Sequence, residues 1–263
     1  MISFTSAQLT AWFAAFIFPL ARILALIASS PIFGNRQVPA RIRVALAVAI
    51  TVIVAPTLNV PVDLDPASAE GILVLLQQIV AGLMMGFSIR LIFTAVEMAG
   101  DIGGMQMGLG FATFYDPQNA AQVPVVAQFL GIMTALAFLA MDAHLYLLAA
   151  LADSFHSFPI GTATMSAGVF RTLVEWGASM FSHALQLALP LIGALLITNL
   201  ALGILTRSAP QLNVFAVGFP ITLMVGFIAL MLALPFLAPL LGTFVQEGMD
   251  VISRMMQGGS AAR

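Results

Sequence analysis

The chain has 263 residues, of which 61% are apolar and only 8% charged, and its mean hydropathy is +1.06. Soluble proteins average about 25% charged residues, so this composition excludes an ordinary soluble domain and indicates an integral membrane protein. The net charge of -2 offers no basic face to nucleic acid, and the lack of cysteine excludes disulfides and thiol chemistry.

The first predicted element is a membrane-spanning helix. Thr5 and Gln8 have the spacing of a capping box, and the apolar run from Leu9 to Phe33 can cross about 30 Å of hydrocarbon. No positively charged leader precedes it, so we expect no cleaved signal peptide. By the positive-inside rule the next loop is cytoplasmic, which places the N-terminus outside. That loop carries the densest basic cluster, Arg36, Arg41 and Arg43.

Two further apolar runs follow. Val44 to Leu58 is short for a span and leads into an acidic loop, Pro61 to Glu70, that fits the outer side. Ile72 to Ala99 is longer and contains Gly82 and Gly86 at small-xxx-small spacing. This spacing predicts close packing against another helix.

The central stretch from Gly103 to Phe114, GGMQMGLGFATF, is apolar yet rich in glycine. Each glycine costs a helix interior about 1 kcal/mol relative to alanine, and the Asp116-Pro117 pair that follows predicts a turn. We therefore expect a helix end that leads into a re-entrant loop, which is tolerated at membrane depth only inside protein or against a cavity. The alternative is a glycine face that packs on a neighbouring helix, because Gly100, Gly104 and Gly108 recur every fourth residue.

If this stretch lines a cavity, it has the chemistry of a deformable seal, because Met adapts to irregular gaps. We therefore treat residues 103–125 as a plug-like loop. The predicted sealing residues are Met105, Gln106, Met107, Leu109, Phe111 and Phe114. The predicted hinge residues are Gly103, Gly104, Gly108, Gly110, Asp116 and Pro117.

The second half contains three more apolar segments. Val126 to Leu151 is followed by an irregular connection, and Leu173 to Leu205 and Val214 to Leu241 form a predicted hairpin. We expect Pro190 to break the first arm of this hairpin and Pro220, Pro235 and Pro239 to break the second. Residues 242–263 form a predicted amphipathic C-terminal tail. The whole chain is predicted to be one polytopic, all-α membrane domain, residues 1–263, with five to six long, kinked apolar helices.

Several ionisable residues lie in or beside these apolar segments, where they are costly and suggest a functional path. They are Arg22, Arg90, Glu97, Asp101, Asp142 and His144, of which Arg90 and Glu97 fall on one helical face. They could form a proton or ion relay, or they could simply pair between helices. No metal-binding, nucleophile or phosphate-loop motif occurs, so the sequence predicts a protein that is not an enzyme and needs no cofactor.

A compact polar turn joins the two arms of the hairpin, at Thr206 to Asn213. Most such turns only connect helices, but a partner could bind its polar groups. Arg207 assigns the turn to the cytoplasmic side, with Pro210, Gln211 and Asn213 beside it.

Three motifs stand out along the chain: MQMGLGFATFYDP at Met105–Pro117, DSFHSFPIG at Asp153–Gly161 and LALGILTRSAPQLNVFAVGFP at Leu200–Pro220. Together they resemble the FliR family, the flagellar type III export-gate component whose injectisome counterpart is called SctT. Length and segment order agree over essentially the whole chain.

The resemblance implies helical hairpins of export-gate type in the bacterial inner membrane, at the flagellar basal body. It also implies assembly with the export-gate components P and Q, contact with the switch protein B, and passage of unfolded export substrates. In that family the loop that matches residues 103–122 plugs the pore from within. The alternative from the residues alone is an autonomous secondary transporter that uses the intramembrane charges as its relay.

Overall fold

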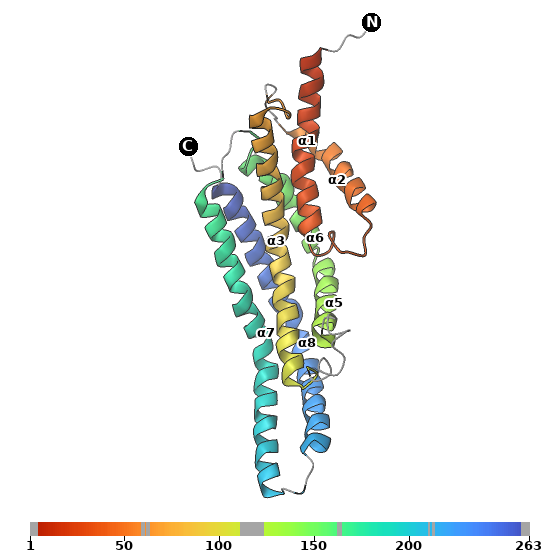
Figure 1. Cartoon of the computed structure of the whole chain (residues 1–263), viewed down its shortest axis with the longest axis vertical. Coiled ribbons are helices and arrows are strands. Elements are labelled where there is room, and N and C mark those ends of the chain that lie inside the picture. Colours follow the sequence, from red (N-terminus) through yellow and green to blue (C-terminus); the bar gives the residue numbers. More distant parts are fainter. Residues whose placement is uncertain are drawn as a thin grey trace. The chain divides into compact units, whose positions relative to one another are not determined.

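The computed structural model describes residues 5–58, 61, 64–110, 124–161, 165–209, 211 and 214–258, and this part of the chain contains helices and no strands. Figure 1 shows the helices in chain order from red to blue. They are α1 (Ser6–Ser29), α2 (Ala40–Val54) with the short 3₁₀ helix η1 (Ala55–Thr57), α3 (Ala69–Gln106), α5 (Val125–Ala140), α6 (Ala143–Ser157), α7 (Ala167–Ser208) and α8 (Val214–Gly258).

Within the described residues, five helical segments are long and apolar enough to cross a membrane: α1, α2 with η1, α3, α7 and α8. The shorter helices α5 and α6 are separated by a break at Met141 and Asp142, and counting this pair as one span gives six. The predicted all-α membrane protein with five to six apolar helices is confirmed.

The helix boundaries correct several expectations. Pro190 lies inside α7, and Pro220, Pro235 and Pro239 lie inside α8, so these prolines do not end either helix. Proline removes only one backbone donor, and surrounding groups in a membrane bundle can satisfy the freed carbonyl. α8 also continues past Gly242, and α6 includes the first residues of the connection that was expected to be irregular.

The contacts divide the chain into two compact units, and α3, α7 and α8 contribute residues to both. Unit 1 comprises Met1–Leu91, Asp142–Gly177 and Val245–Arg263, and unit 2 comprises Ile92–Met141 and Ala178–Phe244. A single polytopic membrane domain stays a prediction. Each unit is described below by itself.

In unit 1, α1 packs on α3 at two glycines. A side chain at Gly82 would collide with the carbonyl oxygen of Arg22, and one at Gly86 would come within 2.7 Å of the carbonyl oxygen of Leu26. Backbone atoms cannot move aside, so only glycine permits this approach. The packing role predicted from the small-xxx-small spacing is confirmed.

Two sets of hydrogen bonds stabilise helices of unit 1. The predicted capping box forms at the start of α1, where Thr5 N–H donates to Gln8 Oε1 at 3.1 Å and Gln8 N–H donates to Thr5 Oγ1 at 3.3 Å. The buried indole of Trp176 on α7 donates to the carbonyl oxygen of Ser88 on α3 at 3.0 Å. The capping box satisfies exposed backbone donors at the start of α1, whereas the Trp176 bond satisfies a buried polar group.

In unit 2, the last turns of α3 pack against α5 and α7. A side chain at Gly100 would come within 2.5 Å of Ala127 Cα, so the two backbones nearly touch there. Phe93 packs on Phe138 with ring centroids 5.6 Å apart. The α7–α8 hairpin is joined at one end by His183 and Phe244, whose rings stack with centroids 4.0 Å apart.

Candidate functional site

The helix α3 ends with a specific backbone motif inside the glycine-rich stretch. Leu109 N–H donates to the carbonyl oxygen of Gly104 and Gly108 N–H donates to that of Met105, both at 3.0 Å. Gly108 has φ +84°. This is a Schellman arrangement, in which glycine adopts the left-handed conformation that side chains disfavour. The helix end predicted from sequence is present, and it lies at Gly108.

The glycines before this end lie inside α3. A side chain at Gly103 would collide with Leu191 of α7, and one at Gly104 would contact Val126 of α5 at 3.7 Å. Both the helix-packing alternative and the helix-end expectation therefore describe part of this stretch. Gly100, Gly103 and Gly104 pack on neighbouring helices, and Gly108 ends the helix.

The two methionines of the stretch differ in how much of the side chain is exposed. Met105 is 63% exposed, whereas Met107 is completely buried. The side chain of Met107 lies against Gly226 of α8, where an added Cβ would be 2.5 Å from Met107 Cγ and 2.8 Å from its Sδ and Cε. Met107 is thus anchored within unit 2, while Met105 is available to a surface outside it.

An apolar cavity of about 390 Å³ lies beside this anchor. Leu109 lines it from the end of α3, and Val125 and Val126 line it from the start of α5. Phe227 and Met231 of α8 form part of the opposite wall. The cavity therefore contacts the residues that precede and follow segment 111–123.

The structure leaves part of the predicted plug untested. Gln106 is exposed, and Leu109 and Gly110 are partly buried. Phe111, Phe114, Asp116 and Pro117 lie outside the described residues. Sequence reasoning missed Gly226 as a partner of the stretch, and the only signal for it was one small residue in a run of larger apolar ones.

A second apolar cavity of about 400 Å³ lies in unit 2 around Pro190 of α7. Its walls include Ala99 of α3, Leu130 of α5 and Leu237 of α8, and Gln186 is the polar side chain in its lining. The sequence analysis did not predict it. Proline-bearing helices pack less closely around the ring, which provides a physical reason for a void at this height.

Arg22 is completely buried in unit 1, and the groups that bind it within the described residues are neutral. Its Nε donates to Gln78 Oε1 at 2.9 Å, and Nη2 donates to the same oxygen. Nη1 donates to the carbonyl oxygen of Ser154 at 2.9 Å, and Nη2 donates to that of Phe158 at 2.8 Å. The guanidinium carbon also lies 4.2 Å from the centre of the Phe155 ring.

This arrangement stabilises the cation without a carboxylate. Ser154 and Phe158 lie at the C-terminal end of α6, where helix carbonyls carry partial negative charge, and the aromatic face adds a cation–π contact. Arg22 therefore links α1 and α3 to the end of α6. Of the two readings of the buried charge, this geometry favours the interhelical link over the relay.

The other intramembrane polar residues do not gather around Arg22. Arg90 and Glu97 are both exposed on α3. Asp142 is exposed in the break before α6, with φ 55°, and caps that helix without a side-chain hydrogen bond. His144 lies in the first turn of α6, where its Nδ1 is buried without a hydrogen-bond partner. Among the described residues, no group of three His, Asp or Glu could hold a metal ion.

Comparison with known proteins identifies the family. The family of bacterial export proteins, family 1, matches residues 13–248. The chain belongs to this family. The flagellar biosynthetic protein FliR of Pectobacterium carotovorum subsp. carotovorum is 43% identical over 257 residues, covering 97% of this chain and 98% of that protein. FliR of Escherichia coli K12 is 42% identical over 239 residues, covering 91% of each chain. FliR of Bacillus subtilis 168 is 34% identical over 225 residues, covering 84% and 86%. The resemblance to the FliR family is confirmed.

The structure describes only part of the polar turn that follows α7, Thr206 to Asn213. Arg207 lies exposed in the last turn of α7, where a cation suits the partial negative charge of the helix end. Gln211 is exposed as well. Pro210 and Asn213 lie outside the described residues, so the proposed partner-binding role of this turn stays a prediction.

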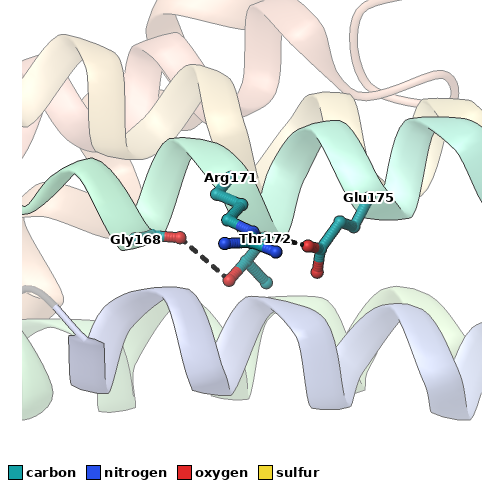
Figure 2. A network of polar contacts seen from close by, with 4 residues as sticks. All are labelled: Gly168, Arg171, Thr172 and Glu175. Atoms are coloured by element: carbon teal, nitrogen blue, oxygen red, sulfur yellow. Dashed lines mark hydrogen bonds and ion pairs between the residues drawn. The ribbon is translucent and has the colours of Figure 1, made fainter.

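One polar contact at the start of α7 was not predicted from sequence. Arg171 Nε lies 2.8 Å from Glu175 Oε1, one helical turn along, and Thr172 donates to the carbonyl oxygen of Gly168 at 3.0 Å (Figure 2). Both charged side chains are largely exposed. Exposed ion pairs contribute little to stability, so this contact is local support for α7 rather than a functional site.

Proposed function

We propose that the chain is a membrane subunit of the bacterial flagellar protein export gate. The support is membership of the bacterial export family over residues 13–248, together with relatives named flagellar biosynthetic proteins that match along almost their whole length. The apolar helices fit a component embedded in the membrane. Its place is the inner membrane at the flagellar basal body, and its role is non-enzymatic.

In this role the chain assembles with export-gate components P and Q, contacts the switch protein B and surrounds unfolded substrates in transit. The exposed apolar side chains along α7 and α8 are compatible with such an assembly, because only 17% of the apolar window of each helix is buried within the described part of the chain. A subunit that completes its packing in a complex has this distribution of apolar surface.

We further propose that residues 103–125 close the passage. One observation carries this proposal: α3 stops at a Schellman turn within an apolar, glycine-rich stretch, and both described ends of the segment line an apolar cavity together with residues of α8. An apolar seal excludes ions, and each Met or Phe contributes roughly 1.5 to 3 kcal/mol of burial. A passing polypeptide can replace such contacts one by one.

The subunit role is tested by co-expression with components P and Q in a strain that lacks the native protein. A stable complex on detergent extraction and restored motility are the expected results. A chain that purifies alone as a monomer or homodimer, and leaves the strain non-motile although it is produced, would contradict the assignment.

The plug is tested by replacing residues 111–123 with a Gly/Ser segment of equal length, which leaves the Schellman turn and the start of α5 intact. We expect the gate to assemble and the cells to leak ions or small solutes. The control is Gly203→Ala, because a side chain there meets nothing within 4 Å. An assembled gate that stays sealed after the replacement would defeat the plug.

A further inference from the structure

Met107 occupies a special position at the end of α3. It is the residue immediately before Gly108, and its own N–H donates to the carbonyl oxygen of Gly103 at 3.0 Å. Its backbone is therefore held by the last turn of the helix, and the chain turns sharply directly after it. Among residues 107–110, Met107 is the one that is fully buried.

The side chain of Met107 joins this helix end to α8. It is completely buried, and it fits where Gly226 has no side chain. An alanine at 226 would place its Cβ 2.5 Å from Met107 Cγ, which is closer than carbon atoms approach without displacement. Because Gly226 has no side chain, the surface of α8 has a notch at this position, and the side chain of Met107 fills it.

One of the apolar cavities is lined by residues that are near neighbours of Met107 and of Gly226 in the chain. The cavity of about 390 Å³ is lined by Leu109, two residues after Met107, and by Phe227 and Leu230, one and four residues after Gly226. Leu230 is one turn along α8 from Gly226 and so shares its face. Met is unbranched and flexible, so its side chain can exchange the notch for the cavity and remain in apolar surroundings.

We propose that the Met107–Gly226 contact is a latch that positions the start of the plug segment, and that the latch must release for substrates to pass. This inference rests on the proposed gate function and adds to it a positioning residue and its partner. Met107 then acts by holding the helix end on α8, and the exposed Met105 is left to meet the passage or a partner subunit.

A reversible cross-link tests the latch directly. The natural chain has no cysteine, so Met107→Cys with Gly226→Cys introduces one pair. An ideal Cβ at residue 226 lies 2.5 Å from Met107 Cγ, so it lies no more than about 4 Å from Met107 Cβ, close enough for a disulfide after a small adjustment. The oxidant diamide takes the two electrons and two protons released when the thiols join. It is applied to gates already assembled in the reduced state.

Bridging is expected to stop export and reduction to restore it. Because only unbridged gates can work, export falls about tenfold when about nine tenths of the chains are bridged. A pair at Met107→Cys and Gly203→Cys, and each single variant, should show the same export with the oxidant as without it. Normal export from bridged gates would overturn the latch, as would thiols that do not join.

A second pair of variants covers the case in which the cysteine gate does not assemble. Gly226→Ala should push Met107 out of its notch and raise resting leak, whereas the same change in a Met107→Ala background should add little. Equal leak increments in both backgrounds would overturn the latch. The plug is tested separately, by the replacement of residues 111–123. If that replacement causes leak and bridged gates still export normally, the plug stands and only the latch is rejected.

Discussion

Arg22 in unit 1 and Met107 in unit 2 are both completely buried, yet they fix their helices by different physics. Arg22 uses directional hydrogen bonds to α3 and to the end of α6, and these bonds have one good geometry. Met107 uses an apolar contact next to a cavity, where another geometry costs little. The first arrangement suits a permanent framework, and the second suits a part that moves.

Removing the polar link should have the largest effect on stability. Arg22→Leu leaves the buried oxygens of Gln78 and Phe158 without the donor that Arg22 supplies, and each such loss costs about 1 to 3 kcal/mol. The carbonyl oxygen of Ser154 keeps its bond from Phe158 N–H. We expect a total loss of several kcal/mol, measured as lower thermal stability of the extracted complex. Arg171→Leu is the matched control and should change little, because that side chain is largely exposed. Equal effects of the two changes would contradict the framework role.

The next largest effect is expected at the contact between α1 and α3. Gly82→Ala places a Cβ against the backbone of Arg22, and overpacking of this kind costs about 1 to 3 kcal/mol. Gly193→Ala is the control, since nothing lies within 4 Å of a side chain there, and alanine can stabilise the helix by about 1 kcal/mol. The two changes should therefore shift the melting temperature in opposite directions. A shift in the same direction would show that this contact does not limit stability.

A smaller and more local effect is expected at the end of α3. Gly108→Ala puts a side chain at φ +84°, a conformation that costs an ordinary residue about 1 to 2 kcal/mol. The helix end should weaken, with faster amide hydrogen exchange at Gly108 and Leu109 and little change in α1. Unchanged exchange at these amides would argue against a strict need for glycine there.

The smallest effect on stability is expected from Met107→Leu. This change conserves volume and should cost less than about 1.5 kcal/mol. The branched leucine has fewer ways to leave the notch at Gly226, so export should slow while the gate stays sealed. Export rate and resting leak measured in the same cells distinguish slower export from a loss of the seal. A loss of stability larger than that of Arg22→Leu would contradict the view that Arg22 belongs to the permanent framework and Met107 to a part that moves.

The sequence correctly predicted several features that depend on residues close together in the chain. The capping box at Thr5 and Gln8 and the close contact at Gly82 and Gly86 were predicted from residue spacing and were found. The end of α3 was predicted from the glycine content of its last stretch and was found at Gly108. The same local rules failed for the prolines of α7 and α8. Proline weakens a helix locally, but packing and an apolar environment keep the helix continuous.

The sequence by itself determined that this is an all-α membrane protein of the bacterial export family, because composition, apolar run length and long motifs are properties of the chain alone. Only the tertiary structure decided which buried residues meet. Arg22 lies far along the chain from Ser154, and Met107 lies far from Gly226, and no local spacing relates the members of either pair. Such pairs are set by how helices pack, so the framework and the proposed latch became visible only when the helices were placed together.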